Sequence, residues 1–129
     1  MMLFHYTVDA DKDFETAVAD LEKALAARKF GVLWKLDVKD KLAEKGVDFA
    51  GNFKILEVCN PVKAKEALEG NMQVGYFLPC KMVVFEEKGR IKMGTVLPTA
   101  IMGLLEEGVP AGLPQEVEKV LIEAIDAAR

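Results

Sequence analysis

One short connection does most to restrict the fold of this chain. Two apolar runs with the character of β-strands, 81–86 and 91–97, are separated by only four residues, whose sequence is EKGR. Gly89 in this connection suits the tight turn of a β-hairpin. Parallel strands need a connection of about a dozen residues or more, so these two runs are predicted to pair as antiparallel neighbours.

Three further segments have the residue pattern of β-strands. Apolar side chains that recur at every second position are typical of a strand, and this alternation is found in 2–8, 30–37 and 53–59. Residues 74–77 fit either a strand or a loop. The chain therefore offers about five strands, two of which are tied together by the hairpin.

Helices are predicted between these strands. Apolar residues spaced by three and four positions predict amphipathic helices over 13–29 and from Pro114 onward. Capping residues mark two shorter helices: Asp37 can cap 38–45, which ends at Gly46, and Asn60 can cap 61–69, with Pro61 as the first helical residue. Pro98 opens a short helical turn.

This order of elements predicts an α+β fold in two layers. We expect an antiparallel or mixed sheet of about five strands, with the helices packed mainly on one of its faces. The length suits a single domain over 1–129, which is long enough to bury a continuous core. The segment 106–112 contains two glycines and a proline, so the final helix could dock as an arm on a neighbouring subunit. Leu3 and Leu33 are on outward positions of their strands. Together with the final helix, they predict a homo-oligomer, most simply a dimer.

Charge and hydropathy exclude several classes of partner. The net charge is −4, and lysines and arginines alternate with acids, so the sequence predicts no nucleic-acid binding. No apolar run reaches the roughly 18–20 residues that cross a bilayer, which predicts no membrane span. The first residues lack the features of a signal peptide, and two cysteines make no disulfide framework. We expect a soluble cytoplasmic protein.

The segment with the most distinctive chemistry contains both cysteines. Cys59-Asn60-Pro61 follows one predicted strand, and Leu78-Pro79-Cys80 precedes another. If Asn60 caps the next helix, the Cys59 thiol lies beside a helix N-terminus, where N–H groups and the dipole favour a thiolate. Cys59 would then be a nucleophile or a soft-metal ligand. The alternative is that it is a small apolar residue at a strand end.

The two cysteines together allow three interpretations. They can be two buried apolar residues, a redox-active dithiol, or half of a thiolate metal site. There is no C-x-x-C spacing of a zinc motif. His5 is the only imidazole that could serve as a third ligand. Because it alternates with apolar neighbours along its strand, we expect an exposed or partner-facing position rather than a role as ligand. The metal site, with Cys59 and Cys80 as candidates, and any cofactor therefore remain unassigned.

Acid–base chemistry is the third candidate activity. Glu57 and Glu86 lie within predicted strands, and a buried pair of carboxylates can act as acid and base. Such glutamates are more often found on the open face of a sheet. The chain has no serine and one histidine, so a Ser-His-Asp triad is excluded.

Several motifs in this chain resemble one small bacterial and archaeal family, the domain of unknown function 302. The likeness is carried by the CNP and LPC elements at 59–61 and 78–80, and by the residues Gly31, Gly75 and Gly89 among others, over about 4–125. It implies a compact α+β domain that stands alone in the cytoplasm and self-associates, with no established activity. It marks Cys59, Asn60, Pro61, Leu78, Pro79 and Cys80 as signature positions without giving them a chemistry.

The favoured hypothesis is a non-enzymatic module that binds a ligand or a partner and self-associates. Its site is expected around Cys59 and Cys80, because the chain offers few titratable groups that could converge in a catalytic pocket. The alternative is thiol-based redox sensing or soft-metal binding through the same two cysteines. The sequence does not indicate which small molecule could be the ligand.

Overall fold

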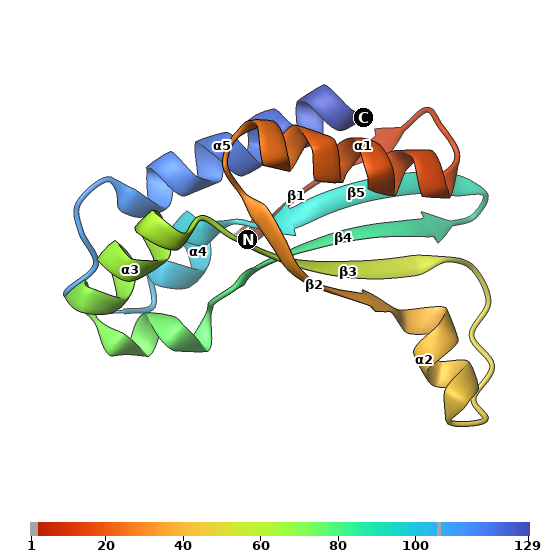
Figure 1. The fold of residues 1–129 in the computed structure, drawn as a ribbon, viewed down its shortest axis with the longest axis horizontal. Helices are drawn as coiled ribbons and strands as arrows, with labels where there is room; N and C mark the ends of the chain where they lie inside the picture. Colours follow the sequence, from red (N-terminus) through yellow and green to blue (C-terminus); the bar gives the residue numbers. More distant parts are fainter. Residues whose placement is uncertain (1–2, 106) are drawn as a thin grey trace.

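The computed structural model describes residues 3–105 and 107–129 (Figure 1). The elements are β1 (His5–Ala10), α1 (Phe14–Ala27), β2 (Gly31–Asp37), α2 (Val38–Glu44), β3 (Phe53–Cys59), α3 (Pro61–Gly70), η1 (Met72–Tyr76), β4 (Cys80–Glu87), β5 (Arg90–Val96), α4 (Pro98–Met102) and α5 (Leu113–Ala128). The predicted order of strands and helices is confirmed. Met2 of the predicted first strand and Glu106 of the predicted flexible segment lie outside the described residues.

The five strands form one antiparallel sheet. Their order across the sheet is β1-β5-β4-β3-β2, and each neighbouring pair is antiparallel. The predicted hairpin joins β4 to β5, and its two central residues, Lys88 and Gly89, both have positive φ, as the tight turns that match the twist of a hairpin require. The predicted fold class is therefore confirmed, with the sheet antiparallel throughout.

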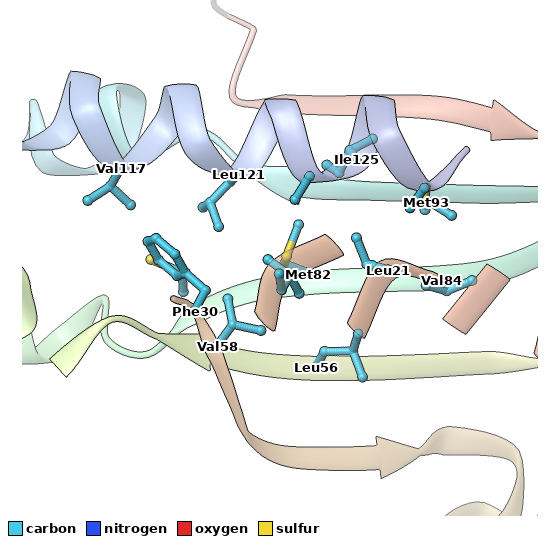
Figure 2. Close-up of a cluster of buried hydrophobic side chains, with 14 of the residues drawn as sticks. Leu21, Phe30, Leu56, Val58, Met82, Val84, Met93, Val117, Leu121 and Ile125 are labelled. Atoms are coloured by element: carbon cyan, nitrogen blue, oxygen red, sulfur yellow. The ribbon is translucent and has the colours of Figure 1, made fainter. Parts of the chain in front are cut away.

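Two long helices cover one face of the sheet. In Figure 1, α1 and α5 lie side by side along this face. Residues of both helices and of the central strands are completely shielded from solvent, and Figure 2 shows the side chains of α5 pointing toward those of β3, β4 and β5. The largest members of this core are Leu21, Leu25, Leu56, Met82, Met93, Leu121 and Ile125.

The final helix packs within its own chain. Leu121, Ala124 and Ile125 of α5 are fully buried, in contact with α1 and the sheet. The expectation that this helix serves as an arm on a neighbouring subunit is therefore wrong. Its apolar stripe is needed to cover the sheet that carries it.

The short helices begin where capping residues were identified. The Asp37 side chain accepts a hydrogen bond from the Asp40 N–H at 3.0 Å, and Gly46, with φ of 76°, follows the end of α2. Residues 74–77, which fitted a strand or a loop, belong largely to the 3-10 helix η1. The Asn71 side chain starts η1 by accepting from the Gln73 N–H at 2.8 Å.

In the part of the chain that the structure describes, no long helix packs on the face of the sheet opposite α1 and α5, which is therefore the open face. Figure 1 shows α2 at the margin of this side, beyond the end of β2, and η1 beyond the other end of the sheet. Within the described residues, no helix is long and apolar enough to cross a membrane.

Candidate functional site

The two cysteine motifs meet at one end of the sheet. In the antiparallel β3–β4 pair, Val58 lies opposite Cys80. Cys59 is the last residue of β3, and Cys80 is the first of β4. The expectation that strand pairing brings these two segments together, although 21 positions separate the thiols in sequence, is met by this register.

A hollow lies at this end of the core. It contains about 360 Å³ of empty space, part of it open to solvent, and only about 20 Å³ is wide enough for the centre of a water molecule. A space of the latter size holds about one water. The hollow continues the core beyond Phe30, Val58 and Val117, which lie together at one end of the cluster in Figure 2. It is a narrow apolar slot rather than a broad cleft.

Four of the six predicted site residues line this hollow. They are Cys59, Asn60, Leu78 and Cys80. Pro61 and Pro79 are not among its lining residues. Pro61 is the first residue of α3, and Pro79 follows a cis peptide bond before β4. Both prolines therefore belong to the backbone that places the lining side chains.

More than half of the lining was not predicted from the sequence. These residues come from β3, α3, α4 and α5 and from the position just before β2, and they are Phe30, Val58, Lys63, Ala64, Ala67, Met102, Leu113, Pro114 and Val117. A partial signal was present in α3, where Ala64 and Ala67 are three positions apart and therefore share a face. The contribution of α5 had no local signal, because it depends on how the helix docks.

Asn60 has the predicted capping role. Its Oδ1 accepts hydrogen bonds from the N–H groups of Val62 and Lys63, both at 3.1 Å. These are two of the N–H groups that an α-helix leaves without a partner in its own first turn. The cap fixes the start of α3, and with it the direction in which the chain leaves Cys59.

The expected activation of Cys59 is wrong. Burial raises the pKa of the Cys59 thiol above its ordinary value, where the helix N-terminus was expected to lower it. The asparagine cap explains the difference, because Asn60 already occupies N–H groups that would have stabilised a thiolate. Desolvation then dominates, since it penalises the charged form of the thiol.

Cys80 is shifted in the same direction and further. Burial raises the pKa of this thiol to about 11, and the nearby Cys59 and Glu57 raise it as well because they are acidic groups. Neither cysteine is in a disulfide. At neutral pH both thiols are therefore neutral, and they behave as small apolar groups.

One ion pair borders the hollow. The Lys63 ammonium donates a hydrogen bond to Glu116 Oε2 at 2.7 Å, which joins α3 to the first turn of α5. This hydrogen bond raises the pKa of Lys63. Phe30, Asn60, Lys63 and Val117 also line a second, more open groove on the outer side of the same region. The apolar slot thus continues into a polar margin.

The other predicted ligands and acids do not join this site. No group of three or more His, Cys, Asp and Glu side chains suitable for a metal ion occurs within the described residues. His5 lies in β1, at the opposite half of the sheet from β3, with its Nδ1 2.9 Å from Thr7 Oγ1. An imidazole there cannot complete a site with the two thiols.

The two glutamates do not form a catalytic pair. Glu57 accepts a hydrogen bond from the Lys81 ammonium across the β3–β4 pair. Glu86 is five positions further along β4 than Lys81, which is about 17 Å at about 3.3 Å per residue. The hypothesis of convergent carboxylates is therefore wrong.

Comparison with known proteins finds a family model and solved structures that are similar to this chain. A family model described as "Domain of unknown function DUF302" matches residues 5–128. The crystal structure of an uncharacterized conserved DUF302 protein from Bacillus stearothermophilus is 43% identical in sequence, with a TM-score of 0.92, and the match covers 99% of this chain and 100% of that one. A search of curated proteins finds no match.

Proposed function

Since the chain belongs to the DUF302 family, whose description carries no activity, we propose a function from the hollow itself: the protein is a non-enzymatic module that binds a small, largely apolar ligand there. The observation that carries this proposal is the convergence of apolar side chains from β3, β4, α3, α4 and α5 on one space that remains partly open. Well-packed cores leave few gaps larger than a water molecule, and the accessible part of this hollow has about the size of one water. A gap at the margin of the core, in contact with solvent, suits a ligand.

The shape of the hollow favours a slim ligand. Ligand pockets are mostly apolar with a few placed polar groups, and here the apolar walls include Leu78, Met102 and Val117. Because only about 20 Å³ is wide enough for a water centre, a ligand has to move the lining side chains apart, and an alkyl chain or the edge of a ring requires less movement than a bulky group. At the margin, Asn60 and the Lys63–Glu116 pair offer contacts to a polar end.

A binding role fits the protonation of the hollow better than catalysis does. A nucleophilic cysteine works as its thiolate, and burial raises the pKa of both thiols. The Lys63 ammonium is held by Glu116, which raises its pKa and keeps it charged. These groups are suited to packing and to charge contacts.

The proposal is tested by titrating the protein with hexanoate and hexanol while amide signals are followed by NMR. Binding in the hollow predicts shifts at Cys59, Ala64 and Val117. The variant Ala64→Phe fills the space and should abolish these shifts, whereas Ala43→Phe, at an exposed position of α2, should not. Unchanged spectra, or equal shifts in Ala64→Phe, would count against the proposal.

A thiol-based function is the second candidate, supported by one observation. Cys59 and Cys80 line the same hollow, and Cys59 is partly exposed. A low-molecular-weight disulfide could oxidise both thiols to a protein disulfide, releasing two thiols as its own reduction product. A soft metal ion such as Cu(I) could instead bind both sulfurs after they lose their protons.

The kinetics of alkylation separate the two candidates. A binding module with neutral thiols predicts that Cys59 reacts with iodoacetamide more slowly than a free thiol at neutral pH. Faster reaction, or formation of a Cys59–Cys80 disulfide at the redox potential of the cytosol, favours the thiol-based function. The variant Cys80→Ala identifies which cysteine has reacted.

A further inference from the structure

The open face of the sheet carries an apolar patch on three adjacent strands. The direction of its side chains follows from two ion pairs: Lys35 of β2 reaches Glu22, and Lys54 of β3 reaches Glu15, both of which belong to α1. Because side chains alternate along a strand, the residues next to these lysines point to the open side. The cross-strand register extends the set to β4. The outer patch consists of Trp34, Leu36, Phe53, Ile55, Val83 and Phe85.

This composition is unusual for a face in contact with water. An antiparallel sheet with one solvated face normally has polar residues on that face. Here Trp34 is 52% exposed, the other five side chains are partly buried, and the rings of Phe53 and Phe85 stack at 5.3 Å between centroids. A contiguous apolar surface that water can reach is a feature of interaction sites. We propose that the outer patch is an interface at which a second copy of this chain packs, open face to open face.

The area of the face is close to what a stable dimer needs. Five strands about 4.8 Å apart give a width of about 24 Å, and seven residues at about 3.3 Å give a length of about 23 Å. Two whole faces bury about 1,100 Å² as flat areas, of which the three strands of the outer patch supply about three fifths, whereas stable interfaces bury about 1,200–2,000 Å². Contacts of α2 with the second copy would add to this area.

The charges on the face favour its own copy over a charged partner. By the same alternation, three acids and three bases point to the open side, so the face has no net charge, whereas the chain carries −4. Five of the six are already in ion pairs, Glu57 with Lys81, and Asp9 with Arg90 and Lys92. A face of neutral pairs and apolar groups can meet itself across a two-fold axis without like charges in opposition. The six are Asp9, Glu57, Glu87, Lys81, Arg90 and Lys92.

Helix α2 and the loop after it lie at the border of the proposed interface. None of the residues of α2 is buried, and Figure 1 shows the helix on the open side of the sheet. The loop that follows exposes Val47 and Phe49. A second copy on the outer patch would lie beside these side chains and remove them from water. This explains why a helix with no buried residue of its own is kept at the margin of the sheet.

The test is the mass in solution, measured by sedimentation at micromolar concentration. The wild type should have twice the 14.2 kDa of one chain, and Trp34→Glu and Val83→Glu should each halve that mass. Met72→Glu, at a position that is 78% exposed on η1, is the matched control and should remain a dimer. Circular dichroism establishes that each variant is folded. Two patch variants are used so that the test still holds if one of them does not fold.

Trp34 also provides a direct signal, because it is the only tryptophan in the chain. Its emission should shift to longer wavelength when the wild type is diluted through the dissociation range, as the indole becomes exposed to water. A wild type with the mass of one chain throughout overturns the proposal and assigns the patch to a different partner. Retention of the double mass by both folded patch variants overturns it as well.

Discussion

Val58 and Cys80 lie directly opposite each other in the β3–β4 pair. This register makes Cys59, the next residue, a diagonal neighbour of Cys80, and both residues line the same hollow. Burial raises the pKa of both. The segment with both cysteines looks the most reactive in sequence, but in the fold it forms the apolar end of the core. Its neutral thiols support a binding site rather than a catalytic one.

The protonation of Cys80 should make native stability depend on pH in alkaline solution. Its thiol has a pKa of about 11 in the fold, against an ordinary value of 9.0. The folded state favours the neutral form, so this contribution is complete below pH 9 and is lost as the pH rises through about 11. We expect urea unfolding to show a loss of about 2–3 kcal/mol over that range. Cys80→Val should remove most of this slope, and identical slopes in the two proteins would contradict the assignment.

The asparagine cap should contribute measurably to the stability of α3. Asn60→Ala leaves the N–H groups of Val62 and Lys63 without their acceptor, and loss of such a cap costs about 0.5–2 kcal/mol. Asn60→Asp keeps an acceptor and is the matched control, which should stay near wild-type stability. Denaturant midpoints decide, and equal midpoints for the alanine and aspartate variants would reject the capping role.

The docking of α5 on its own chain predicts a large cost for Leu121→Ala. Leu121 is fully buried between the helices and the sheet, and truncation of a core leucine costs about 2–5 kcal/mol. Leu104→Ala, at a side chain that is 74% exposed, should change the free energy of unfolding by less than about 0.5 kcal/mol. Thermal or urea unfolding compares the two variants. An equally small change in the free energy of unfolding for Leu121→Ala and Leu104→Ala would mean that α5 is not part of the core.

A close backbone contact fixes the chain beside the hollow. A Cβ added at Gly70, at the end of α3, would lie 1.9 Å from the carbonyl oxygen of Gly108. Gly70→Ala should therefore displace the segment that leads into α5, at a cost of about 1–3 kcal/mol. Gly75→Ala meets only Leu68 at 3.7 Å, an ordinary contact, and serves as control. The prediction fails if both variants unfold at the same temperature.

Local patterns were sufficient for most of the fold. The strand Phe53–Cys59 has the predicted bounds, because strict alternation ends at a residue pair, Asn60 and Pro61, that starts a helix. The turn at Lys88 and Gly89 predicted one antiparallel pair of strands. The short connections elsewhere in the chain favoured the same pairing for the rest of the sheet. The 3-10 helix at 72–76 was missed because it is too short to show a period and depends on the cap by Asn71.

The site depended on contacts that local patterns do not encode. Cys59 and Cys80 could be placed together because each ends a strand, but Met102 and Val117 reach the hollow from helices far along the chain. The pKa shift of the Cys59 thiol was predicted in the wrong direction because burial is a property of the whole fold. The destination of α5 was predicted wrongly for the same reason, since an apolar stripe does not specify which surface it covers.

The most direct measurement for the proposed function is the detection of nuclear Overhauser contacts between bound hexanoate and the methyl groups of the protein. Binding in the hollow predicts contacts from the alkyl chain to Leu78, Met102 and Val117, with the carboxylate toward Lys63. All of them should disappear in Ala64→Phe. Contacts to Ile55 and Val83 on the open face of the sheet, or none at any ligand concentration that leaves the protein folded, would contradict the account.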